Sequence, residues 1–220
     1  MLEILPESIG HALQGQRAGL EKILFNRRDL RSGTAKLEIS SLAFADYGQI
    51  PAQFTADGEG LSPPLSWRGV PPAATTLVLI VEGADSPTPE PLVHAIAVNI
   101  DPARDGICEG ELSEGDSGED AGGSALHLGR NSYLRRTWMP PDPPPGHGKH
   151  RYAFELFALT TGAGFSDAPG REEVATAVRE RGIASGCLIG IYERDNRVKL
   201  QESARAEGEV SMPEMIGVAS

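Results

Sequence analysis

The chain of 220 residues is long enough for one domain with a short appendage, and its 40% hydrophobic residues indicate a globular protein. Its 17 prolines and 26 glycines favour a β fold with long loops over a helix bundle. The formal net charge of −11 argues against a nucleic-acid partner and against electrostatic attachment to anionic lipid, because both require a basic surface.

Residues 1–34 are predicted to form an N-terminal helical extension. An apolar stripe with the 3.6-residue helical period runs through residues 1–30. It comprises Leu2, Leu5, Ile9, Leu13, Leu20, Ile23 and Leu24. Three glycines interrupt the stripe, so the helix needs tertiary packing to persist. We expect it either to cover its own domain or to pair with a second copy in a homodimer, and residues 32–34 to form a linker.

Residues 35–200 are predicted to form a β domain, because short apolar or alternating segments recur between turns rich in Pro and Gly. A helix is predicted at residues 171–181, where Val174 and Val178 lie one turn apart and Gly182 provides a stop. The predicted strands are residues 36–40, 76–81, 92–100, 151–159 and 187–192. This order of elements predicts a mainly β protein, an antiparallel β-sandwich with peripheral helices.

Two polar stretches are predicted to lie outside regular structure. Residues 109–120 contain six acidic residues and no basic one, which predicts a solvated, mobile loop. The spacing of an EF-hand is absent, so a calcium loop is disfavoured. Residues 201–220 are predicted to form a polar, frayed tail.

The common enzyme signatures are missing from the chain: it has no nucleophile elbow, P-loop, dinucleotide-binding glycine set or zincin motif. Cys108 and Cys187 follow no metal or redox spacing, so we expect two reduced thiols. No apolar run approaches the roughly 20 residues that span a bilayer, and the N-terminus lacks the features of a secretory signal. We therefore expect a cytoplasmic protein without integral membrane contact.

Two segments contain residues suited to ligand binding. The first places Asp85 just after a predicted buried strand and His94 at the start of the next. The second is a proline-rich run, residues 140–146, which leads into His150, Arg151 and Tyr152; prolines can wall a pocket with little loss of entropy on binding. Strand alternation places His150 and Tyr152 on one face and Arg151 on the other, where we expect a structural salt bridge.

Both segments resemble blocks of the phosphatidylethanolamine-binding protein family: its D-P-D-x-P…H block and its G-x-x-P-x-G-x-H-R-Y block. Shorter stretches in the same order resemble the bacterial Raf-kinase-inhibitor-like (YbhB/YbcL-type) branch of that family. They are residues 50–51, 55–59, 61–67 (L-S-P-P-L-S-W), 69–71 and 129–132. The resemblance covers roughly residues 36–195.

The resemblance implies a β-sandwich with a shallow anion pocket at the strand ends, which takes phosphate or a phosphorylated, phospholipid-type head group. The ligand-binding residues that it implies for this chain are Asp85, His94, Asp142, His150 and Tyr152. It implies a non-enzymatic and possibly regulatory protein without catalytic residues, metal or cofactor. The family block has two acids in the first turn, whereas Gly83 stands at the first position here.

Two other functions are compatible with the same residues. Asp85, His94 and His150 could form a metal site or an acid–base pair of an enzyme. The name of the branch suggests a protein-interaction inhibitor of a kinase or protease. For the anion-binding function, histidines that titrate near ~6.5 predict binding that weakens between about pH 6 and 8.

The remaining residues of note are expected to have structural roles or none. We expect Trp67 in the core and His147 at the surface of a glycine-rich loop. Asp57 is expected to fix the turn at Gly58 through a bond to the backbone. His11 and His127 have no assigned role.

Overall fold

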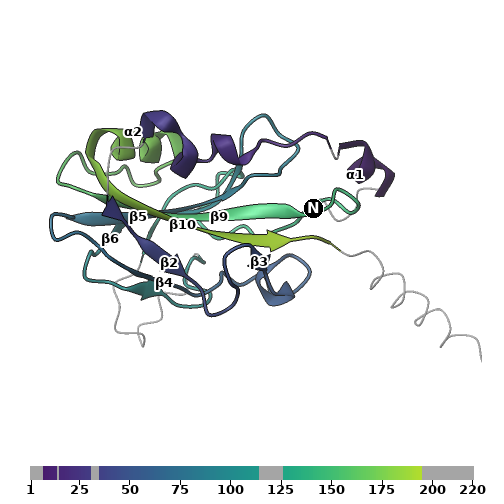
Figure 1. The fold of residues 1–220 in the computed structure, drawn as a ribbon, viewed down its shortest axis with the longest axis horizontal. Helices are drawn as coiled ribbons and strands as arrows, with labels where there is room; N and C mark the ends of the chain where they lie inside the picture. Colours follow the sequence, from purple (N-terminus) through teal and green to yellow (C-terminus); the bar gives the residue numbers. More distant parts are fainter. Residues whose placement is uncertain (1–6, 14, 31–34, 114–125, 195–220) are drawn as a thin grey trace, which may run out of the picture.

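The computed structural model describes residues 7–13, 15–30, 35–113 and 126–194, which form a two-layer sandwich of sheets with helices on one face (Figure 1). In the described residues the larger sheet has seven strands. They are β1 (Ala35–Lys36), β3 (Gly48–Gln49), β5 (Thr76–Gly83), β6 (Leu92–Ile100), β8 (His127–Leu128), β9 (His150–Leu159) and β10 (Gly182–Tyr192). The smaller sheet consists of β2 (Glu38–Ser40), β4 (Leu65–Arg68) and β7 (Gly106–Ile107).

The central strands of the large sheet run antiparallel in the order β10, β9, β5, β6 and β8, whereas β1 and β3 pair with β10 in parallel. Strand β5 is an unbroken apolar run because both of its faces are covered. Leu77 and Leu79 belong to the core between the two sheets, and Val78 and Ile80 face the helices. The predicted antiparallel sandwich with peripheral helices is confirmed.

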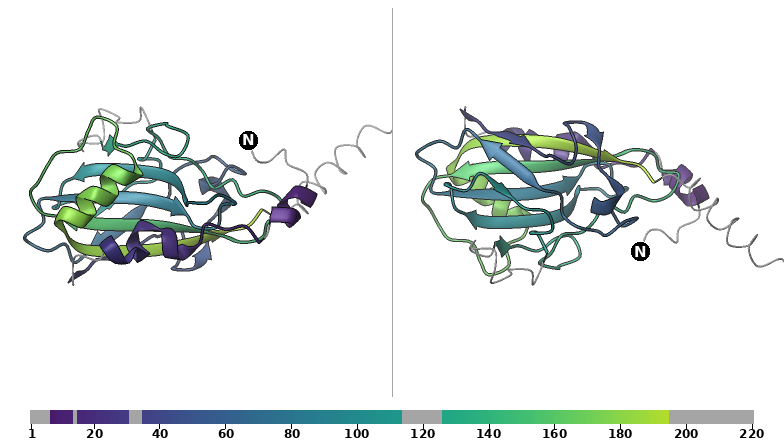
Figure 2. Two further views of the ribbon diagram at one scale, coloured as in Figure 1. Left: turned by 90° about the horizontal axis from the view of Figure 1, so that it is seen from above. Right: turned by 90° about the horizontal axis from the view of Figure 1, so that it is seen from below.

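The predicted late helix is also confirmed as α2 (Arg171–Arg181), which ends where Gly182 begins β10. Val174 and Val178 are buried against the large sheet. Figure 2 shows α2 and the N-terminal segment crossing the same face of that sheet. The opposite face packs on the smaller sheet, where the predicted core residue Trp67 is buried and donates a hydrogen bond to the carbonyl of Arg104.

The prediction of one helix over residues 1–30 is wrong. Helix α1 spans only Glu7–Leu13, and three 3-10 helices follow at Leu20–Lys22, Leu24–Asn26 and Arg28–Leu30. Gly19 explains the break, because its φ of 98° is left-handed and its N–H donates to the carbonyl of Ala84 rather than within a helix. Residues 15–30 thus run as a strap along the sheet.

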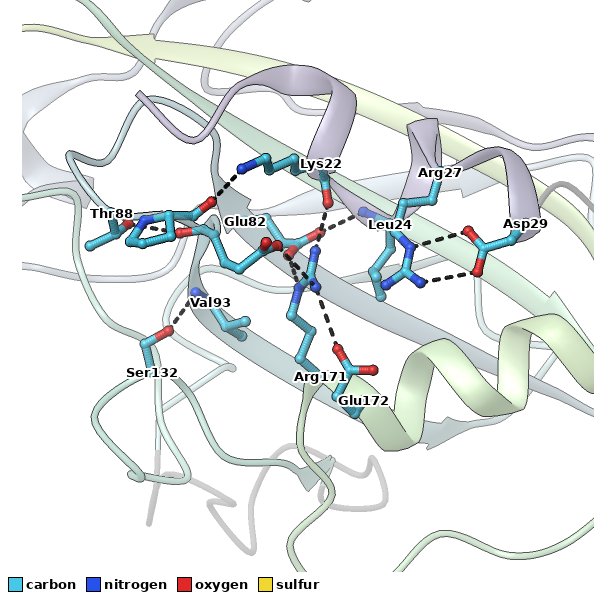
Figure 3. A network of polar contacts seen from close by, with 12 residues as sticks. Lys22, Leu24, Arg27, Asp29, Glu82, Thr88, Val93, Ser132, Arg171 and Glu172 are labelled. Carbon is cyan, nitrogen blue, oxygen red and sulfur yellow. Dashed lines mark hydrogen bonds and ion pairs between the residues drawn. The ribbon is translucent and has the colours of Figure 1, made fainter. Parts of the chain in front are cut away.

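The strap is fixed by apolar burial and by buried carboxylates. Leu24, from the predicted stripe, is fully buried in the same cluster as α2. Its N–H donates to Glu82 Oε2 (2.7 Å), and Arg171 bridges Glu82 Oε1 (2.6 Å) and the carbonyl of Lys22 (2.6 Å), as Figure 3 shows. Of the two arrangements expected for the extension, the described residues show the one in which it covers its own domain.

Two other expectations meet different outcomes. Asp57 accepts hydrogen bonds from Tyr192 and Arg194, and its backbone N–H donates to the hydroxyl of Thr55. The expected bond from the Asp57 side chain to the backbone at Gly58 stays a prediction. The linker at 32–34, most of the acidic loop and the tail at 201–220 lie outside the described residues. Within the part of the chain that is described, no helix has the length and apolar character to cross a membrane.

Candidate ligand pocket

A cavity of about 420 Å³ lies at the end of the sandwich where β6 and β9 begin. Its apolar wall includes Leu92, Trp138, Met139, Pro140, Pro143 and Pro144. Four of the five predicted site residues line the same cavity: His94, Asp142, His150 and Tyr152. The proline-rich run therefore forms a wall of this pocket, as the sequence predicts.

His94 lines this cavity and has one bare ring nitrogen. Its Nδ1 lies 2.6 Å from the carbonyl oxygen of Met139, which can only accept, so Nδ1 carries the hydrogen. In the neutral ring Nε2 is then an acceptor, and it has no hydrogen-bond partner among the described residues. Burial lowers the pKa of His94 to about 4, against a smaller upward effect of the bond to Met139, so the ring is neutral near neutral pH.

His150 is held in a similar state by a second histidine. His147 Nε2 lies 2.8 Å from the carbonyl oxygen of Leu13, and His147 Nδ1 lies 2.6 Å from His150 Nε2. Burial and, after it, the neighbouring His147 together lower the pKa of His150 to about 3. His147 is fully buried, so its prediction as a surface residue is wrong. Left-handed backbone at Gly146 and Gly148 turns the loop inward and places this side chain inside.

Asp85 does not line the cavity. Its carboxylate accepts from the backbone N–H (2.8 Å), Nε (2.7 Å) and Nη2 (2.7 Å) of Arg151, and Arg17 lies 3.2 Å away. Burial raises its pKa, but the hydrogen bonds and charge of Arg151 outweigh this and leave the pKa lowered. The structural salt bridge predicted for Arg151 is present, and its partner is the carboxylate that the resemblance implies for the ligand.

Gly83 determines how close His94 and Tyr152 can come. It lies on the middle strand β5, opposite Leu92 on β6 and Tyr152 on β9. A Cβ at this position would lie 2.8 Å from His94 Nε2, which is closer than such contacts allow. Because the side chain is missing, the His94 ring packs edge-on against Tyr152, with ring centroids 5.0 Å apart.

The hydroxyl of Tyr152 and the rim complete the polar features of the cavity. The Tyr152 hydroxyl has no hydrogen-bond partner among the described residues, and burial raises its pKa well above the usual value. Asp142 pairs with Arg194 (2.7 Å), whereas Arg135 is exposed at the rim without an ion pair in the described chain. Sequence reasoning missed both arginines, because each lies in no block of the resemblance and is placed only by tertiary structure.

No group of three or more His, Cys, Asp or Glu side chains within the described ranges is placed to hold a metal ion. Asp85 is occupied by Arg151, so it is not available to complete a set with His94 and His150. The metal-site alternative therefore finds no support in the arrangement of these residues.

Comparison with known proteins shows the family of the chain. A model of the family described as phosphatidylethanolamine-binding protein matches residues 40–193. The chain belongs to the phosphatidylethanolamine-binding protein family. Every residue that lines the cavity falls inside this match. Leu13 and Arg17, which contact the loop of His147, fall outside it.

Similar members of this family occur in archaea and bacteria. The chain is 36% identical to the UPF0098 protein of Methanothermobacter thermautotrophicus over 158 residues, 72% of this chain and 99% of that protein. A solved phosphatidylethanolamine-binding protein homologue of Chlamydia trachomatis has a TM-score of 0.64 at 31% identity and covers 74% of this chain and 100% of its own. Escherichia coli YbcL, with a TM-score of 0.65 at 23% identity over 73% of this chain and 100% of its own, supports the fold alone.

The protonation states of His94 and His150 differ from those predicted from the sequence. The two histidines were expected to titrate near ~6.5. With pKa values lowered to about 4 and about 3, neither ring of the unliganded protein changes charge between pH 6 and 8. The predicted cause of a pH-dependent affinity in that window is therefore wrong, and another titrating group has to supply any such dependence.

Proposed function

We propose that this chain binds a phosphate-like anion, either free phosphate or a phosphorylated head group, in the His94–His150 pocket without converting it chemically. The observation that supports this most directly is a set of three side chains that line one cavity, each with a polar atom that has no partner among the described residues: His94 (Nε2), His150 (Nδ1) and Tyr152 (hydroxyl). Polar groups of buried side chains normally have a partner, so three on one cavity-lining set favour a ligand. Cytoplasmic location and a regulatory role remain predictions.

The surroundings of these atoms suit a phosphorylated organic molecule. The guanidinium of Arg135 at the rim supplies a positive charge for an anion. Trp138 and the prolines form a stiff apolar wall for the rest of the ligand. The name of the family, phosphatidylethanolamine-binding protein, describes a ligand with the same two parts.

Calorimetric titration with inorganic phosphate tests the proposal. Tyr152→Phe removes only a hydroxyl and should weaken phosphate binding by about tenfold, which is the usual loss for one hydrogen bond to a charged group. The control is His127→Asn: His127 contacts Asn99 and the carbonyl of Asp167 and does not line the cavity. Equal affinity of wild type and Tyr152→Phe, or no phosphate binding by wild type, would overturn the proposal.

A further inference from the structure

Helix α1 is connected to the ligand pocket by two consecutive hydrogen bonds. The carbonyl of Leu13 can only accept, so His147 Nε2 carries a hydrogen across the 2.8 Å contact. With that single hydrogen on the ring, His147 Nδ1 is bare. That atom accepts across the 2.6 Å contact from His150 Nε2, which must carry the hydrogen. The remaining ring nitrogen of His150, Nδ1, is left unprotonated, and His150 lines the cavity.

Arg17 holds the two parts of this connection together. Its guanidinium donates to the carbonyls of Lys149 (2.7 Å) and His147 (2.9 Å) and lies 3.2 Å from Asp85. The loop around His147 is thereby fixed to Leu13 of α1 and Arg17 of the strap, which fall outside the part of the chain that matches the family. Which ring nitrogen of His150 carries the hydrogen thus depends on a segment that does not line the cavity.

The His94 ring likewise has one bare nitrogen, but for a separate reason. The carbonyl of Met139 fixes the hydrogen on Nδ1 and leaves Nε2 bare. The cavity therefore contains two hydrogen-bond acceptors on neutral rings, His94 Nε2 and His150 Nδ1. A fully deprotonated anion would place its oxygens against two lone pairs. An anion that carries a hydrogen of its own can instead donate it to either ring.

We propose that His147, held by Leu13 and Arg17, is a positioning residue that keeps His150 Nδ1 unprotonated, and that the pocket consequently selects an anion bearing its own hydrogen-bond donor, such as protonated phosphate. This inference rests on the proposed function and adds a selectivity to it. Sulfate has the shape of phosphate but no hydrogen near neutral pH. A site built to pair a ligand hydroxyl strongly rejects the analogue that lacks it.

The test compares phosphate with sulfate by calorimetry near neutral pH, together with nitrogen-15 NMR of the histidine rings. Wild type should prefer phosphate by at least about tenfold. His147→Phe keeps a ring but removes both contacts, so the preference should fall towards unity. His147→Asn places an amide oxygen near the position of Nδ1 and should retain it. The wild-type spectrum should show His150 Nδ1 unprotonated and Nε2 protonated.

The possible outcomes separate the two proposals. Equal binding of both anions by wild type, or a hydrogen on His150 Nδ1, overturns the inference and leaves the proposed function standing. Absence of binding of either anion overturns both. If His147→Phe does not fold, the wild-type spectrum and the ratio of affinities in wild type and His147→Asn still decide. Loss of the preference in His147→Asn, with the fold intact, also counts against a positioning role.

Discussion

Glu82 and Glu155 share a hydrogen bond beneath the N-terminal strap, and each also accepts a backbone N–H from it. Leu24 donates to Glu82 (2.7 Å) and Phe25 donates to Glu155 (2.6 Å). Both carboxyl groups are fully buried, and Glu155 Oε1 finds no donor among the described groups. Because two adjacent buried carboxylates repel, Glu155 holds a proton and donates it to Glu82, which is the partner of Arg171.

Glutamine substitutions should therefore have unequal effects on stability. Glu155→Gln imitates a neutral carboxyl that accepts from Phe25 and donates to Glu82, so it should not lower the free energy of unfolding near pH 7. Glu82→Gln leaves Arg171 without its buried partner and should cost roughly 3 kcal/mol. Urea unfolding measures both, and a larger loss in Glu155→Gln would contradict the assigned proton.

The effect of Glu155→Gln should also depend on pH. Burial, followed by the charge of Glu82, raises the pKa of Glu155 well above its usual value. Above about pH 4.5 the unfolded chain has lost this proton and the folded chain has kept it, so wild-type stability falls as pH rises. Glutamine removes this dependence. Relative to wild type, Glu155→Gln should gain stability between about pH 5 and pH 8; a constant difference across these values would show that the carboxyl is ionised in the fold.

The strap should contribute to the stability of the domain through its apolar residues as well. Leu24 is completely buried against α2 and the large sheet, whereas Leu42 is 97% exposed. Leu24→Ala should lower the free energy of unfolding by about 2–5 kcal/mol, because it removes buried methyl groups and leaves a cavity. Leu42→Ala is the matched control and should change it by less than about 0.5 kcal/mol. Equal, small effects would mean that the strap is not docked in solution.

The sequence predicts those parts of the structure that are determined by residues within one short segment. The strands follow from alternation within each segment, and α2 follows from Val174, Val178 and the stop at Gly182. The pocket histidines were found through short blocks that match a family. The role of Asp85 could not be found in this way, because its main partner Arg151 is brought to it only by the pairing of β5 with β9, and Arg17 only by the folded strap.

The inward position of His147 had a signal in the sequence that was not used. A histidine between two glycines can be turned inward when both glycines adopt left-handed backbone, and Gly146 (φ 76°) and Gly148 (φ 86°) do so. The acceptor, Leu13, comes from a segment whose predicted single helix would have carried it elsewhere. The error at His147 thus follows from the error at residues 1–30.

Gly83 should be required for ligand binding because it leaves space for the His94 ring. An alanine Cβ would lie 2.8 Å from His94 Nε2 and would push the ring away from Met139 or into the cavity. Gly83→Ala should therefore weaken phosphate binding by about tenfold, the loss of one good hydrogen bond. Gly164→Ala, where an added Cβ meets nothing within 4 Å, is the control. Unchanged affinity in Gly83→Ala would show that His94 is not a ligand contact.

The pH dependence of binding should come from the ligand rather than from the protein. His94 and His150, with pKa values lowered to about 4 and about 3, are already neutral above pH 5. A phosphomonoester loses its second proton near pH ~6 and with it the only hydrogen that it can donate to the two rings. Its affinity should be nearly constant between about pH 5 and 6 and then fall by about tenfold per pH unit.

Calorimetry with methyl phosphate at about pH 5.5, 6.5 and 7.5 measures this profile. Dimethyl phosphate, a diester with no hydrogen to donate, should bind weakly at all three values. His127→Asn should reproduce the wild-type profile, since that residue lies away from the cavity. If methyl phosphate binds equally at pH 5.5 and 7.5, the pocket accepts the dianion, and the acceptor state deduced for His94 and His150 is wrong.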